Sequence, residues 1–330
     1  MRPIVRGEPS PPGLVDTLTA GFQAVNRIPW VIALPVALDF LLWLGPRLSI
    51  ASLSERGLNA LSQLTAQMSA SASPAAVDQL GQLQQQIDLA RGMTQMFNLL
   101  SLVAFGALAM RSAVPADQSG AGGSVEIGTV GAVVGLGALL VLAGVAFACV
   151  WLGFIAQQVR EGRVDVPRLG RSAPRYWVAI VAFFVLLFAI LVAVAVPLSA
   201  LAAVMQAIAP AVGAFVAVFA AIAFQLLLFW CLLYLFFFGD AIVVSEVGPV
   251  RAALTSIRVV STNFWSTLGF IIITWVIMSG MGVIWASLAR APVGIVVAIL
   301  GNGYIESGLA AASMLFYRQR VARLEPRRSA

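Results

Sequence analysis

The fold is decided by residues 177–239, which read WVAIVAFFVLLFAILVAVAVPLSALAAVMQAIAPAVGAFVAVFAAIAFQLLLFWCLLYLFFFG and contain no charged side chain. This run of 63 residues is far too long for one transmembrane helix, because about 20 apolar residues span a bilayer. Pro197 and Pro210 bracket a weaker stretch, Leu198–Ala209. We therefore predict two membrane spans joined by a short turn, in an all-α fold.

Other apolar runs flank this pair of spans. They cover Ile127–Gln158, Phe264–Ala289 and Ala291–Tyr317, together with Pro29–Pro46, which only Asp39 interrupts. Together with the two central spans, these runs predict a polytopic transmembrane helical bundle of six spans. Phe97–Met110 is uncharged for 14 residues, a length more typical of an interfacial, re-entrant or buried helix than of a crossing. We assign it as one additional helix of that kind, with a seventh crossing as the alternative.

The composition excludes a water-soluble protein. Of the 330 residues, 60% are hydrophobic and 10% are charged, whereas soluble domains have about a quarter of their residues charged. All 20 basic residues are Arg, and both Lys and His are absent. This excludes His-based nucleophilic catalysis, His-ligated metals, Schiff-base lysines and Walker-type phosphate loops. We expect no catalytic residue, no metal site and no cofactor, and therefore no enzyme.

The placement of Arg predicts the orientation of the chain in the membrane. With six spans, the cytoplasmic segments contain 15 of the 20 Arg, and these segments are 1–27, 157–175, 240–263 and 318–330. A seventh crossing would give the same number, so the arginine count does not choose between them. Arg27, immediately before the first span, and the weak hydrophobicity of Phe97–Met110 favour six spans with both termini cytoplasmic.

The net charge of +6 is best explained by this orientation. It is spread over four strips beside the membrane, where anionic lipid headgroups are the expected partner and nucleic acid is not. The first 27 residues lack an apolar core, so Pro29–Pro46 is expected to be a retained anchor rather than part of a cleaved signal. These features predict a multi-pass protein of the cytoplasmic membrane of a bacterium.

Three stretches of the chain share one register. In each, a polar or basic residue such as Arg27 or Arg175 closely precedes a Trp at the start of a span, at Trp30, Trp177 and Trp265. We expect these side chains to be interfacial anchors. An amphipathic pattern upstream of each Trp predicts an elbow helix along the cytoplasmic surface. Any helix that enters a membrane from the cytoplasm shows Arg and an aromatic residue there, which explains each instance but not the shared register.

We therefore predict a single membrane domain, 1–330, built from three units of an elbow helix and a hairpin. The units are 13–158, 159–239 and 240–317, followed by a basic tail, 318–330. Unit one contains an extracytoplasmic insertion, 51–126, in which two helices are expected to break at Ser69–Pro74. This helical hairpin either caps the outer face or binds a protein partner. Residues 116–124, ADQSGAGGS, are typical of a flexible linker.

Two carboxyl groups, Asp39 and Glu306, fall inside predicted spans. Ionisable groups within a bilayer are costly and are functional candidates by default. Gln225, Asn302 and Tyr304 complete the candidate intramembrane polar site. One interpretation is a proton- or cation-coupled transport site. The other, which we favour because transporters usually have more polar residues in each span, is that these groups hold neighbouring helices together.

Small residues and sulfur groups have simpler interpretations. Gly308 and Ala312, four residues apart, permit close approach of another helix. Cys149 and Cys231 fall within spans and are expected to be small buried apolar residues. Phe238-Gly239-Asp240 lacks the first Gly of the motif used by intramembrane aspartyl proteases, so a protease is rejected.

A pattern in the last third of the chain indicates a family. It consists of Asp240, Gly248-Pro249, Ala253-Leu254, Ser256 and Asn263-Phe264-Trp265. With Gly153–Trp177, it resembles bacterial polytopic membrane proteins related to the membrane domain of glycerophosphodiester phosphodiesterases, over about half of the chain. Ser256 lies one position earlier than in that group, and the insertion 51–126 departs from it. The phosphodiesterase chemistry belongs to a separate soluble barrel, so the resemblance implies no activity.

Taken together, these patterns predict a non-enzymatic membrane component that acts through lipid contact or through assembly with a partner. The alternative is a small-solute transporter that uses Asp39 and Glu306.

Overall fold

The computed structural model describes residues 13–69, 74–106, 110–115 and 118–324. The helices in these ranges are α1 (Leu14–Asn26), α2 (Ala33–Leu44), α3 (Ala51–Ser69), α4 (Pro74–Met96), α5 (Leu102–Gly106), α6 (Val130–Glu161), α7 (Val166–Ile208), α8 (Pro210–Tyr234), α9 (Phe238–Ser245), α10 (Pro249–Thr262), α11 (Phe264–Leu288) and α12 (Pro292–Leu324). Two 3₁₀ helices, η1 (Pro29–Ile32) and η2 (Leu99–Ser101), and two strands, β1 (Arg47–Ser49) and β2 (Ser124–Glu126), complete the described elements.

Five stretches of helix are long and apolar enough to cross a membrane. They are α6, α7, the pair α8–α9, α11 and α12. A sixth is reached if α1 and the stretch Pro29–Leu44, bent by 95° from each other, are counted as one broken span. The prediction of an all-α, polytopic helical bundle is confirmed. The expected six spans lie at the upper end of this range.

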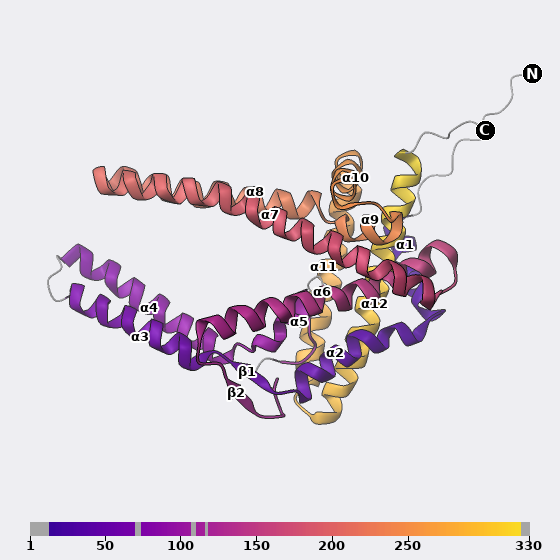
Figure 1. The fold of residues 1–330 in the computed structure, drawn as a ribbon, viewed down its shortest axis with the longest axis horizontal. Coiled ribbons are helices and arrows are strands. Elements are labelled where there is room, and N and C mark those ends of the chain that lie inside the picture. Colours follow the sequence, from indigo (N-terminus) through magenta and orange to yellow (C-terminus); the bar gives the residue numbers. More distant parts are fainter. Residues whose placement is uncertain (1–12, 70–73, 107–109, 116–117, 325–330) are drawn as a thin grey trace, which may run out of the picture. The chain divides into compact units, whose positions relative to one another are not determined.

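The chain divides into two compact units. The first contains the chain up to Val31, Cys149–Ile277 and the chain from Ser307 onward; the second contains Ile32–Ala148 and Met278–Glu306. In the first unit, α7 and α8 lie side by side as a hairpin (Figure 1). In the second, α3 and α4 form another hairpin.

The turn between the two central spans differs from the prediction. Helix α7 continues through Pro197 and ends at Ile208, and the chain turns at Ala209 before Pro210 begins α8. The stretch 198–209 is rich in Ala, Leu and Met, which are strong helix formers, so it extends the first span instead of forming the turn. A Pro inside a membrane helix is tolerated when neighbouring groups satisfy the freed carbonyl.

Two of the three predicted elbow helices are separate elements. Helix α1 precedes Trp30 and α10 precedes Trp265, whereas the region upstream of Trp177 is the first part of the continuous helix α7. The start of α7 has the expected signals, because Asp165 accepts a hydrogen bond from the Arg168 N–H (3.0 Å) and Pro167 lies in the first turn. The threefold repeat stays a prediction from the sequence.

The insertion contains the two expected helices, α3 and α4. Its base is closed by the short parallel strands β1 and β2, which pair Arg47 with Ser124 and Ser49 with Glu126. The expectation of a flexible linker is wrong for the described part of 116–124; Ala116 and Asp117 lie outside the described residues. The Arg47 N–H donates to the Gly123 carbonyl (2.7 Å) and the Ala121 N–H donates to the Trp43 carbonyl (2.9 Å).

The segment Phe97–Met110 forms two short helices in its described part, η2 and α5. Helix α5 has five residues, far fewer than the roughly 20 that a helix needs to cross a bilayer. Asn98 caps η2, because its Oδ1 accepts from the Leu100 N–H (3.0 Å). Residues 107–109 of this segment lie outside the described residues.

The core of the first unit is an aromatic cluster. The rings of Phe237 and Phe316 stack with centroids 5.4 Å apart, and Phe270 lies 4.8 Å from Phe316. All three side chains have no exposed surface. The Arg320 guanidinium lies over the Phe316 ring, 3.6 Å from its centroid.

Ser256 of α10 joins this core to the break between α8 and α9. Its hydroxyl donates to the Tyr234 carbonyl (2.7 Å) and accepts from the Phe237 N–H (3.2 Å). The residue is fully buried. A break between helices leaves backbone N–H and C=O groups without hydrogen-bond partners. The Ser256 hydroxyl is the partner of two such groups.

We expect Ser256→Ala to destabilise the protein by about 1–3 kcal/mol, because it leaves buried backbone groups unpaired. Ser261→Ala is the matched control, since the exposed Ser261 hydroxyl donates to the Arg258 carbonyl in its own helix. The measurement is the thermal unfolding midpoint of each purified variant in detergent. Equal midpoints for the two variants would contradict this role for Ser256.

Candidate functional site

Asp39 and Glu306 are both buried in the second unit. Asp39 lies on α2 beside the buried Leu38 and Leu42, and its side chain is on the face of the helix that packs inward. Glu306 lies on α12, one turn after Asn302, and both are buried. The exposed fractions of Asp39 and Glu306 are 5% and 7%, so each carboxyl needs partners inside the protein.

The partners are backbone groups of residues 110–115, a segment outside any helix or strand. The Arg111 N–H donates to Glu306 Oε1 (2.8 Å), and the Asn302 amide donates to the Arg111 carbonyl (2.7 Å). Two residues further on, the Ala113 N–H donates to Asp39 Oδ2 (3.2 Å). Three of the predicted site residues are therefore brought together on one stretch of backbone.

The apolar side chains of the same segment enter the core of the second unit. Val114 packs with Ala289, Ile295 and Ile299, and Ala113 packs with Trp285 and Ala298. Irregular backbone at membrane depth is stable only where protein satisfies its polar groups. Asp39, Asn302 and Glu306 form hydrogen bonds with the backbone of this segment. All three side chains therefore have a structural role.

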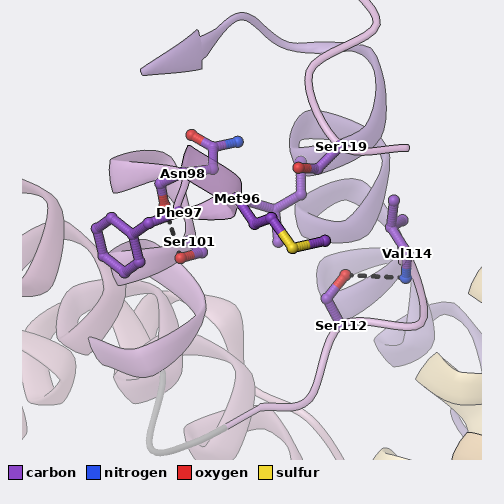
Figure 2. Close-up of a pocket in the computed structure, with 8 residues that line it drawn as sticks. Met96, Phe97, Asn98, Ser101, Ser112, Val114 and Ser119 are labelled. Carbon is purple, nitrogen blue, oxygen red and sulfur yellow. Dashed lines mark hydrogen bonds between the residues drawn. The ribbon is translucent and has the colours of Figure 1, made fainter. Parts of the chain in front are cut away.

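A cavity of about 190 Å³ lies next to this segment in the second unit. Figure 2 shows the residues around it, among them Asn98, Ser101, Ser112 and Ser119. The Ser112 hydroxyl accepts from the Val114 N–H (3.1 Å) and also lies within hydrogen-bonding reach of Asp39. The cavity is below the roughly 300–1,000 Å³ of a typical small-molecule site, and its size suits a few waters or a small ion.

The other predicted site residues have different surroundings. Tyr304 is half-buried on α12, between Asn302 and Glu306. Gln225 lies on α8 in the first unit and is exposed. Of the predicted interfacial anchors, Arg27, Trp30, Arg175 and Trp265 are exposed, and Trp177 is half-buried. Cys149 is buried, whereas Cys231 is half-buried.

A third buried acid was missed by the sequence analysis. Asp240 of α9 accepts a hydrogen bond from the Ser313 hydroxyl of α12 (2.5 Å), within the first unit. The sequence predicts a cytoplasmic position for Asp240, because the uncharged run 177–239 ends there. The apolar residues on both sides, Phe236–Phe238 and Ala241–Val244, are the signal that would have identified it as buried.

The first unit also contains an ion-pair network around Glu246. Its carboxylate lies 2.7 Å from the Arg160 guanidinium and 3.5 Å from that of Arg168, and it accepts a hydrogen bond from the Tyr176 hydroxyl (3.0 Å). Arg168 also pairs with Glu161 (2.6 Å). Partial burial opposes ionisation, but the hydrogen bond from Arg160 lowers the pKa of Glu246 below its ordinary value of 4.5.

This network predicts a dependence of stability on pH. A group whose pKa is lowered by folding stabilises the protein above its ordinary pKa, and the contribution is lost as the pH falls through the folded-state value. We therefore expect the unfolding midpoint of the wild type to fall more than that of Glu246→Gln between about pH 6 and about pH 3.5. Scanning fluorimetry in detergent measures both slopes, and parallel slopes would contradict the prediction.

The fold and the buried polar contacts define an α-helical membrane protein. Residues 88–320 match a family described as a domain of unknown function, DUF7847, and the chain belongs to that family. No curated protein and no solved structure matches the chain.

Proposed function

We propose that the protein is a multi-pass integral component of the bacterial cytoplasmic membrane, with both termini cytoplasmic and no enzymatic activity. In this proposal it acts through contact with lipid and through assembly with a protein partner. The supporting observation is the surface of the hairpin α7–α8. Large apolar side chains remain exposed along both helices, including Phe188 (68%), Phe215 (72%) and Phe219 (65%).

Helix α10 supports the lipid-contact part of the proposal. It buries Ala252, Ser256 and Val259, while Val250 and Leu254 remain exposed. Trp265, immediately after it, is 80% exposed. A helix with an outward apolar strip beside an exposed Trp is typical of one that lies in the membrane interface.

A partner surface is proposed on the insertion 51–126. The exposed apolar residues of α3 follow the spacing of one helical face, at Leu61, Leu64 and Met68. On α4, Leu89, Met93 and Met96 do the same. Exposed apolar faces of this kind mark interaction sites.

We also propose kinship with the membrane domain of glycerophosphodiester phosphodiesterases. The support is the sequence pattern around Gly248-Pro249 and Asn263-Phe264-Trp265. Ser256, which lies one position earlier than in that group, bonds to the backbone of Tyr234 and Phe237. A residue used in this way belongs to the architecture of the fold, so the kinship concerns a scaffold and no reaction.

Labelling of single cysteines tests the membrane arrangement. In a Cys149→Ala/Cys231→Ala background, we expect Gly57→Cys to react with an impermeant maleimide in intact spheroplasts. Ser329→Cys is expected to react only after permeabilisation. Reaction of both in intact spheroplasts would refute cytoplasmic termini, and extraction of the protein by alkaline carbonate would refute integral insertion.

Purification in native-lipid nanodiscs tests the assembly role. We expect a defined set of proteins to co-purify with the wild type and to be lost from Leu61→Gln/Leu64→Gln. The matched control is Leu226→Gln/Leu232→Gln, which changes two exposed apolar residues of α8. Recovery of the same proteins with both variants would contradict a partner surface on α3.

Transport remains the second candidate function. The observation in its favour is that Ser112, which lies within hydrogen-bonding reach of Asp39, lines a cavity sized for water or a small ion. Proteoliposomes with an imposed pH gradient test it. A proton flux that the wild type supports and Glu306→Gln abolishes, with unchanged thermal stability, would establish transport over a structural role.

A further inference from the structure

A groove of about 900 Å³ lies in the first unit, between the first part of α7 and the residues that connect α9 to α10. Its α7 side presents Arg171 and Arg175, followed along the helix by Val178 and Ala182. Its other side presents residues 246–249 and the buried Ile242. The volume is within the range of sites that hold a small ligand.

The positive charge at this groove is only partly neutralised. Glu246, the acidic residue of the lining, already interacts with Arg160, Arg168 and Tyr176. Arg171 and Arg175 are exposed and, among the residues that the structure describes, neither lies within salt-bridge distance of a carboxylate. Because they are four residues apart, they project from the same face of α7, and the groove therefore has two unmatched guanidinium groups.

The backbone at Glu246 indicates that this carboxylate is fixed in place. Glu246 ends α9 with a positive φ of 52°, a conformation that usually selects Gly or Asn at the end of a helix. A larger residue persists there when surrounding contacts hold it. Here the contacts are those with Arg160, Arg168 and Tyr176, so the acidic end of the groove already has its partners while its arginine end remains available.

Charge and apolar surface follow each other along the axis of α7. From Arg171 to Ala182 the helix rises about 16 Å. The arginines come first, then Val178 and Ala182. The predicted interfacial anchor Trp177 lies between the two groups in the sequence. This order matches an amphiphile whose anionic head is at the membrane surface and whose chain enters the bilayer.

We propose that this groove binds one anionic phospholipid, with its phosphate on Arg171 and Arg175 and an acyl chain along Val178 and Ala182. The inference rests on the proposed function, in which the protein is integral to the membrane and contacts lipid. It goes further by assigning a single defined site. Guanidinium groups suit this role because they bind phosphate oxygens in pairs.

Native mass spectrometry of the detergent-purified protein tests the site, with phosphatidylglycerol and phosphatidylcholine as probes. We expect one saturable phosphatidylglycerol adduct, which Arg171→Gln/Arg175→Gln weakens by about 30-fold, from about 1 kcal/mol for each arginine. Arg251→Gln/Arg258→Gln is the matched control, because it removes the same charge from exposed positions of α10 outside the groove. The control is expected to bind phosphatidylglycerol as the wild type does.

A second variant separates the acyl chain from the head. Ala182→Trp fills the apolar part of the groove and is expected to weaken phosphatidylglycerol binding while both arginines remain. Gel filtration reports whether each variant folds. If Arg171→Gln/Arg175→Gln does not fold, Ala182→Trp still tests the proposal. Inorganic phosphate is expected to compete weakly, since it lacks the chain.

Several outcomes would overturn the inference. They are equal binding of the two lipids, equal loss in both double variants, full competition by inorganic phosphate, and unchanged binding to Ala182→Trp. If the protein resists carbonate extraction but shows any of these results, the groove assignment fails while the proposed membrane role stands. If carbonate extracts the protein, the proposed function itself fails.

Discussion

Glu306→Leu is expected to destabilise the protein by about 1–3 kcal/mol, whereas Glu306→Gln is expected to be nearly neutral. Glu306 Oε1 accepts the Arg111 N–H at 2.8 Å. Leucine leaves that partly buried N–H without its acceptor. Glutamine keeps an acceptor oxygen at the same place. The unfolding midpoint in detergent, followed by tryptophan fluorescence, ranks the three proteins.

Cysteine reactivity gives a local measurement of the same prediction. In a protein without Cys149 and Cys231, Ser112→Cys reports on the segment that Glu306 holds. We expect Glu306→Leu to raise its rate of modification and Glu306→Gln to leave the rate unchanged. Glu55→Leu is the matched control, since Glu55 accepts one exposed hydrogen bond from Gln95. If Gln and Leu at position 306 are equally destabilising, an acceptor oxygen for the Arg111 N–H is not what stabilises this segment, and the prediction is wrong.

The long helices could be predicted from the sequence because hydrophobicity and length are local properties. The uncharged run 177–239 predicts the hairpin α7–α8, although the turn is confined to Ala209 and the rest of the stretch between Pro197 and Pro210 is helical. A proline signal is ambiguous in an apolar helix, because the surrounding Leu and Ala favour continuation more than one missing hydrogen bond opposes it.

The convergence of Asp39, Asn302 and Glu306 could be predicted only in part. The location of Asp39 and Glu306 inside predicted spans follows from the sequence. Their partners, however, are the backbone groups of Arg111 and Ala113. Every residue has such groups, so the sequence contains no side-chain signal for them. The same reason explains the error at 116–124, where glycines permit close backbone contact. A Cβ on Gly122 would lie 2.6 Å from the Leu44 carbonyl oxygen.

Gly21→Ala is expected to destabilise the protein by about 1–3 kcal/mol through overpacking. A Cβ at Gly21 of α1 would lie 2.6 Å from the Ala312 backbone nitrogen and 2.7 Å from its Cα, on α12. Backbone atoms cannot move aside as a side chain can, so α1 must shift. This contact places Ala312, predicted to permit close helix approach, directly against α1 within the first unit.

Two matched glycines make the prediction specific to that contact. A Cβ at Gly170 of α7 meets nothing within 4 Å, so Gly170→Ala is expected to be neutral or stabilising, because Ala favours the helix. A Cβ at Gly308 would meet the Phe22 ring. We expect Gly308→Ala to lower the stability less than Gly21→Ala does, because a ring can rotate. Unfolding midpoints in the order Gly170→Ala, Gly308→Ala, Gly21→Ala, from highest to lowest, would show that α1 is held by backbone contact with α12. A midpoint for Gly21→Ala equal to that of Gly170→Ala would mean that α1 is free to move away.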